Sequence, residues 1–228
     1  MKFVFSDDKY QMNWFREDFE YAAVTCPQEI KYKVMNRCEE DRIDTEISFI
    51  NEGRKPFFSY TGSIAIAFPL MDTYEDSDTC LTKRCNTHIF CGGNVSYIMA
   101  LRMGGEAPHL GMVLTEGSLA DYSIERDVKR QSNDRGCFWL HPSAMEFAPG
   151  ETKKISWTVF KHNGKADFME KLGEYSSFVD IRSERYVLFA GEQNTITIKP
   201  SFDANTITID GTEIDLKADP EVPADTKI

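Results

Sequence analysis

The sequence predicts an all-β protein, an antiparallel β-sandwich with one short helix. Apolar and polar residues alternate with a period of two through much of the 228-residue chain. Such alternation is typical of strands with one buried and one solvated face. Turn-forming segments rich in Gly and Asn separate the strands, and a single segment has a clear helical period. Many short strands joined by turns favour two packed sheets over alternating strands and helices.

The predicted strands of the sandwich follow one another from residue 31 to residue 160. Their inward positions are apolar, as Ile47 and Phe49 illustrate. The segments with this alternation are 31–34, 45–50, 63–68, 96–101, 122–124 and 155–160. Turn signals lie between them at 51–54, 92–94, 103–105, 148–150 and 162–164.

The one predicted helix covers residues 165–178. Phe168, Leu172 and Tyr175 recur there at the spacing of one helical face, so we expect this face to be buried. Asn163 precedes the segment and is of a residue type that caps helix N-termini.

Beyond the helix, strands are predicted at 185–190, 195–199, 206–209 and 213–216. Asp210-Gly211 separates the last two and indicates a tight hairpin. Four strands in about forty residues form too little core to stand alone. We therefore divide the chain into a β-sandwich domain, 1–178, and linker strands or the start of a further module, 179–228. In the alternative, the four strands extend the first sandwich. The Pro- and acid-rich end favours a domain junction in a longer polypeptide.

The charge of the chain limits its partners. There are 37 acidic and 26 basic residues, a formal net charge of −11, which disfavours nucleic acid and anionic membranes. The longest apolar run, 64–68, is too short to span a bilayer. The first ten residues lack the apolar core of a signal peptide, so the chain as written is expected in the cytoplasm. Six scattered cysteines are then mostly reduced thiols.

Cys80, Cys85, His88 and Cys91 form the sharpest cluster of potential metal ligands. Four such ligands can hold a tetrahedral zinc ion. However, a strand over 87–91 places His88 and Cys91 on opposite faces, and the spacing matches none of the common zinc motifs. Packed thiols are the favoured interpretation, and we expect neither a metal nor another cofactor.

No catalytic residue is assigned from the sequence. There is no G-x-S-x-G nucleophile motif and no glycine-rich phosphate loop. Carboxylates that can hydrolyse glycosides are abundant, but abundance without geometry identifies no pair.

The segment 132–142 carries the candidate binding residues Asp134, Arg135, Trp139 and His141. Sugar sites combine an aromatic face for the apolar side of a pyranose ring with planar polar groups for hydroxyls. We therefore predict Trp139 and His141 at the wall of a carbohydrate site, with Asp134 and Arg135 bonded to hydroxyls. In the alternative, Asp134 and Arg135 stabilise a turn and Trp139 fills the core.

Several short motifs together carry a resemblance. They are RCNTHI (84–89), ALRMGGEAPHLG (100–111), SNDRG (132–136), PGE (149–151) and WTVFKH (157–162). Over 44–178 the chain resembles the amino-terminal β-sandwich, or supersandwich, domain of large bacterial carbohydrate-active enzymes of glycoside hydrolase type. In those proteins an (α/α)-barrel catalytic domain follows downstream. The end of the chain from Tyr186 resembles the start of an immunoglobulin-like module.

The resemblance implies a bacterial protein whose sandwich packs on a catalytic domain, lines its cleft and in some cases meets a second protomer. The catalytic acids of the family lie in the barrel, so none is transferred to this chain. The positions that match the family, serving either the fold or a cleft, are His88, Arg102, Glu106, His109, Asp134 and Arg135.

Three functions remain open. The first is a non-catalytic module of a glycan-processing protein that packs on a catalytic domain and contacts carbohydrate. The second is a small glycoside hydrolase or lyase in its own right, with Asp134 and His141 as acid and base. The third is a structural or adhesive module without a ligand.

Overall fold

The computed structural model describes residues 1–126, 135–209 and 211–215. The chain divides into two compact units, Met1–Ser176 and Ser177–Ile228. The first unit is an antiparallel β-sandwich with two short helices, which confirms the predicted fold class. Neither helix in the described part of the chain is long and apolar enough to cross a membrane.

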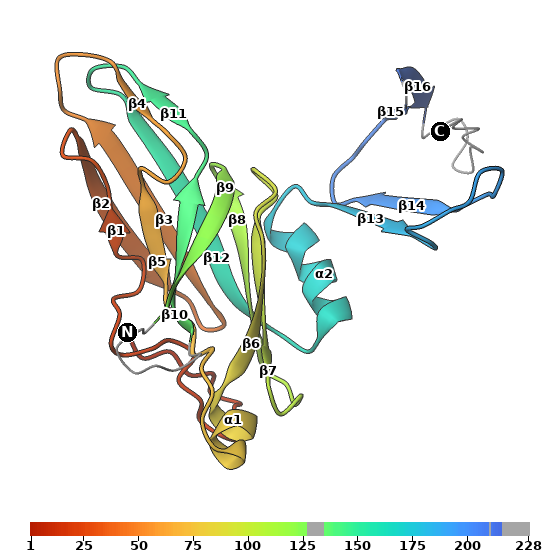
Figure 1. The fold of residues 1–228 in the computed structure, drawn as a ribbon, viewed down its shortest axis with the longest axis horizontal. Coiled ribbons are helices and arrows are strands. Elements are labelled where there is room, and N and C mark those ends of the chain that lie inside the picture. The colour runs from red at the N-terminus through yellow and green to blue at the C-terminus, as the bar shows by residue number, and fades with distance from the viewer. Residues whose placement is uncertain (127–134, 210, 216–228) are drawn as a thin grey trace. The chain divides into compact units, whose positions relative to one another are not determined.

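Two sheets form the sandwich (Figure 1). The larger has six strands in the order β2 (Ile30–Cys38), β3 (Arg42–Asn51), β12 (Thr152–His162), β8 (His109–Glu116), β7 (Tyr97–Arg102) and β6 (Cys85–Phe90). The smaller has four in the order β1 (Val24–Thr25), β5 (Ala65–Phe68), β10 (Arg135–Pro142) and β9 (Leu119–Arg126). A two-stranded ribbon pairs β4 (Phe57–Ser59) with β11 (Met145–Phe147).

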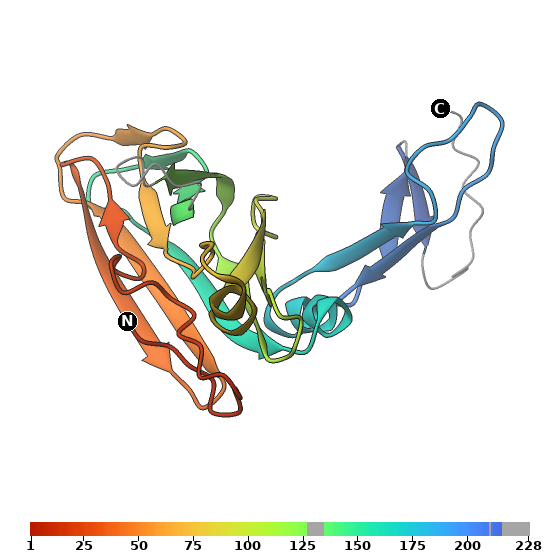
Figure 2. The ribbon, with the colours of Figure 1, turned by 60° about the horizontal axis from the view of Figure 1, so that its bottom comes forward.

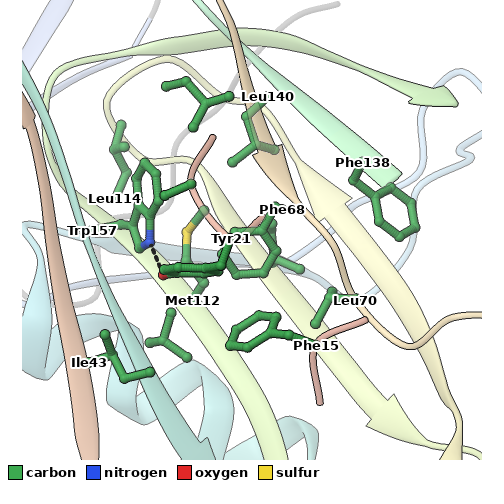
Figure 3. Packing of buried hydrophobic residues seen from close by; sticks show 14 of the residues in the cluster. Phe15, Tyr21, Ile43, Phe68, Leu70, Met112, Leu114, Phe138, Leu140 and Trp157 are labelled. Carbon is green, nitrogen blue, oxygen red and sulfur yellow. Dashed lines mark hydrogen bonds between the residues drawn. The ribbon is translucent and has the colours of Figure 1, made fainter. Parts of the chain in front are cut away.

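Aromatic side chains fill the space between the two sheets (Figure 3). Phe68 of the smaller sheet and Trp157 of the larger meet edge to face, with ring centroids 6.3 Å apart. Tyr21 lies between the sheets, where its hydroxyl accepts a 2.8 Å hydrogen bond from the Trp157 indole and lies 3.0 Å from Thr45 Oγ1. The polar groups of Tyr21 and Trp157 are therefore satisfied in place, whereas the buried indole nitrogen of Trp14 has no hydrogen-bond partner among the described residues.

Helix α2 (Lys165–Tyr175) covers part of the outer face of the six-stranded sheet (Figure 2). As predicted, Phe168 and Leu172 are buried. The Phe168 ring stacks on Phe160 of β12 at a centroid distance of 5.9 Å. Gly111 of β8 makes room for this contact, because a Cβ there would lie 2.6 Å from the Phe160 ring.

The ends of α2 differ from the prediction. Its N-cap is Gly164 rather than Asn163, and no side chain caps it. The backbone N–H of Asn163 instead donates to the carboxylate of Asp167, at 2.6 Å. The helix ends at Tyr175, three residues early, where Ser176 turns to extended backbone.

A second helix, α1 (Ser77–Lys83), was not predicted. Asp76 caps it by accepting a hydrogen bond from the backbone N–H of Thr79 at 3.0 Å. None of its residues is buried. A seven-residue helix without a buried face has no apolar stripe for a periodicity argument to detect.

The second unit contains two short ribbons. β13 (Val179–Ser183) pairs with β14 (Ile196–Pro200), and β15 (Thr206–Ile209) pairs with β16 (Thr212–Asp215) in the predicted hairpin. The predicted strand at 185–190 is wrong, because these residues form an exposed loop.

Hydrogen bonds within that loop replace those of a strand ladder. Asn194 accepts from the backbone N–H of Arg185 and donates to its carbonyl, both at 3.1 Å. Val179–Ser183, where no strand was predicted, supplies the pairing instead.

Candidate functional site

The predicted sugar-contacting residues lie on β10, between β5 and β9. Phe138 and Leu140 of this strand belong to the core, so Trp139 and His141 lie on the outer face of the four-stranded sheet. Arg135 begins the strand. Asp134 lies outside the described residues. Of the four predicted residues, Trp139 and His141 thus share one solvent-facing surface.

Trp139 is half-buried, directly opposite Ala67 on β5 and Ser123 on β9. Its indole N–H donates to Glu125 Oε2 at 3.1 Å. The alternative in which Trp139 fills the core is wrong, since the core tryptophans are Trp14 and Trp157. Its two neighbours across the sheet, Ala67 and Ser123, are small, and the Trp139 side chain is partly exposed.

The His141 ring is held by two partners from neighbouring segments. Its Nδ1 lies 3.2 Å from the carbonyl oxygen of Ile64, and its Nε2 lies 2.8 Å from Ser123 Oγ. A carbonyl only accepts, so in the neutral ring Nδ1 carries the hydrogen and Nε2 accepts from the Ser123 hydroxyl. The imidazole therefore has a defined orientation beside Trp139.

Cys137 precedes Trp139 on β10 and is fully buried. Burial raises the pKa of its thiol to about 12, so the reactive thiolate is not formed near neutral pH. Cys137 is therefore a packed cysteine of the sandwich.

Ser123 and Glu125 are the residues of this surface that sequence reasoning missed. They alternate with Tyr122 and Ile124, which pack on the core, and this alternation was visible in the sequence. What was not visible is that β9 pairs with β10 in the register that sets Ser123 opposite Trp139.

Two of the positions that match the family, Arg102 and His109, are buried and make hydrogen bonds within the fold. Arg102 and Asp8 form an ion pair at 2.8 Å in which both side chains are fully buried. Burial opposes ionisation of Asp8, but hydrogen bonds from Arg102 and from the N–H groups of Tyr10 and Met12 outweigh it and lower its pKa. The backbone N–H of Arg102 also donates to His109 Nδ1 at 3.1 Å.

The cysteine and histidine cluster is dispersed. Cys80 lies on α1, whereas Cys85 points into the core and His88 is exposed on β6. Among the described residues no group of three or more His, Cys, Asp or Glu side chains is placed to hold a metal ion. All six cysteines carry free thiols.

Comparison with solved structures identifies a similar fold. The polysaccharide lyase BACCELL_00875 matches 94% of this chain at a TM-score of 0.76 and 24% sequence identity. This chain resembles part of a polysaccharide lyase. It spans 40% of the length of that lyase. A putative kojibiose phosphorylase from the human microbiome matches 65% of this chain and 19% of its own, at 16% identity. Its TM-score of 0.39 carries no argument.

No family model and no curated protein matches the chain. At 24% identity the similarity to the lyase establishes the fold. The fold of this chain thus also occurs in part of that polysaccharide lyase.

Proposed function

We propose that this chain is a non-catalytic β-sandwich module of a larger glycan-processing protein, and that it contacts polysaccharide through the outer face of β9 and β10. The fold shared with part of a polysaccharide lyase, of which the chain spans 40%, supports the first half. The partly exposed indole of Trp139 is the observation that supports contact with polysaccharide.

The surface around Trp139 suits a sugar ring. The partly exposed indole of Trp139, flanked by the small Ala67 and Ser123, offers an apolar face to the C–H side of a pyranose. Glu125, which accepts the indole N–H, has carboxylate lone pairs left for sugar hydroxyls. His141 and Ser123 add a second polar edge on the same face.

In this proposal the catalytic residues belong to a separate domain of the parent protein. The sandwich packs on that domain, and Ser177–Ile228 contributes to an immunoglobulin-like module next to it. The parent protein is bacterial and cytoplasmic, and its other partners are carbohydrate and, where it assembles, a second protomer.

The test is binding of the full chain to an array of neutral and acidic polysaccharides, with hits measured by calorimetry. We expect Trp139→Ala to weaken a hit about tenfold or more, because it removes the stacking face. Trp139→Phe should retain much of the affinity, since it keeps a ring and loses only the N–H.

Tyr60→Ala is the matched control. It removes an aromatic side chain that is 70% exposed and lies directly after β4, outside the proposed surface. The affinity for the polysaccharide should therefore be unchanged. Equal affinity of Trp139→Ala and the unmodified chain, with both folded, would reject the sugar-contacting surface.

A second candidate function rests on the 2.8 Å contact between His141 Nε2 and Ser123 Oγ. A serine, a base and an oriented partner are the parts of a hydrolytic site. We expect the chain alone to turn over neither glycosides nor uronides. Turnover that disappears in His141→Ala would replace the module proposal with an enzyme.

A further inference from the structure

A shallow groove of about 370 Å³ crosses the outer face of the six-stranded sheet, over β2, β3, β12 and β8. Two cross-strand rows line it. One contains Arg37, Asp44 and Thr158, and the other contains Met35, Glu46 and Ser156. Trp139 lies on the outer face of the other sheet, so the groove and the Trp139 surface are on opposite sides of the sandwich.

Short side chains produce the depression. Ser156 and Thr158 stand on the central strand β12, whereas the longer Met35 and Arg37 stand on the edge strand β2. The register of β8 against β12 shifts at Ser156/Trp157, and Thr115 is the extra residue. This bulge adds an exposed hydroxyl to the groove, and bulges are frequent beside binding sites.

The carboxylates of the groove each pair with a cationic side chain. Lys154 Nζ lies 2.9 Å from Glu46 and, with its hydrogen bond, lowers the pKa of that carboxyl. Asp44 accepts from Thr158 at 2.7 Å and pairs with Arg42 at 3.2 Å. Each carboxylate keeps free lone pairs for further hydrogen bonds.

Arg37 differs from these residues, since it makes no ion pair or hydrogen bond with any residue that the structure describes. Its guanidinium therefore offers donors toward the groove beside the acceptors of Asp44 and Glu46. The thioether of Met35, 46% exposed, provides an apolar contact in the same place.

This chemistry selects among ligands. The net charge of −11 disfavours phosphates and carboxylates. A bare cation would gain little binding energy, because Asp44 already pairs with Arg42 and Glu46 already pairs with Lys154. Adjacent donors, acceptors and an apolar patch instead match a ligand that carries all three, such as the hydroxyls and C–H groups of a sugar.

We infer that the groove over β2, β3, β12 and β8 is a second carbohydrate-binding site, specific for uncharged sugar chains, on the side of the sandwich opposite Trp139. It rests on the cavity and its polar lining, independently of the Trp139 surface.

The experiment is a titration of the ¹⁵N-labelled full chain with cellohexaose, xylohexaose and mannohexaose, and with an oligogalacturonate of equal length. We expect at least one neutral hexasaccharide to shift the amide signals of Thr45, Glu46 and Trp157, whose backbone lies along the groove. The oligogalacturonate should shift them less at equal concentration.

Ser156→Leu fills the groove and should weaken the neutral response about tenfold or more. Thr152→Leu is the matched control, on the same face of β12 but outside the groove, and should leave the response unchanged. Glu46→Gln, which keeps the side-chain shape, is the second groove variant and should also weaken it. A dispersed spectrum verifies that each variant folds.

Three outcomes overturn the inference. They are groove amides that no neutral sugar shifts, a response that both Ser156→Leu and Glu46→Gln leave intact, and a stronger response to the anionic sugar. Shifts confined to the amides around Trp139 would likewise reject the groove while leaving the proposed function standing. Shifts of the groove amides without any shift of the amides around Trp139 would reject the Trp139 surface and leave the groove standing.

Discussion

At the scale of single residues, burial decides what the titratable side chains do. His162 is fully buried on β12 under α2, and the ring centroid of His109 lies 5.3 Å away. Its Nε2 has no hydrogen-bond partner among the described residues. Burial, together with the charge of His109, lowers the pKa of His162 to about 4. The ring is therefore neutral in the folded protein well below the pH at which it titrates in the unfolded chain.

This shift predicts a loss of stability in mild acid. Between about pH 6.5 and about pH 4 the unfolded chain binds a proton at His162 that the folded chain does not, so the free energy of unfolding falls as pH falls. The contribution is up to about 3 kcal/mol. Urea unfolding at pH 7 and pH 4.5 measures it. His162→Leu cannot titrate, so its stability should fall less over this interval, and equal losses in both proteins would contradict the assignment.

At the scale of elements, each face of a strand acquires its role from what covers it. The inward faces of both sheets form the aromatic core, whereas α2 packs on part of the outward face of β12 and β8. Phe168 provides that cover by stacking on Phe160 above Gly111. Beyond the helix the same face is open and holds the polar groove.

The role of α2 predicts a large effect of Phe168→Ala. Removing a fully buried ring beside Phe160 should lower the free energy of unfolding by about 3–5 kcal/mol, because it loses apolar burial and leaves a cavity. Glu174→Ala on the exposed side of α2 is the control and should change it by less than about 0.5 kcal/mol. Chemical denaturation measures both, and similar small losses would show that the helix contributes little to the sandwich.

At the scale of the whole molecule, the core belongs to one unit. Every described member of the core cluster lies within Met1–Ser176. Ser177–Ile228 contains two-stranded ribbons and large exposed apolar side chains, among them Tyr186 and Phe189. Isolated two-stranded ribbons bury little apolar surface and are marginally stable.

We therefore expect a chain ending at Ser176 to fold and to keep its melting temperature within about 2 °C of the full chain. Differential scanning calorimetry of both proteins measures this. A much lower melting temperature of the shorter chain would show that the second unit stabilises the sandwich.

The sequence by itself determined the local features that depend on a repeating pattern. Period-two alternation located β2, β3, β5, β7, β9 and β12, the spacing of Phe168 and Leu172 located α2, and Asp210-Gly211 located the last hairpin. It did not locate β8, whose first six residues are all buried. It failed for α1, which buries no face, and for 185–190, whose apolar residues have no partner strand.

Tertiary structure decided which residues meet. Ser123 lies opposite Trp139, and Asp44 lies between Arg37 and Thr158, only because their strands pair in one register. Of these pairs, Asp44 and Thr158 are 114 residues apart in the sequence. A one-residue shift would move every side chain of a strand to the other face, and no local pattern specifies the partner strand. The candidate surfaces therefore depend on which strands pair and in which register, whereas the elements that carry them are encoded locally.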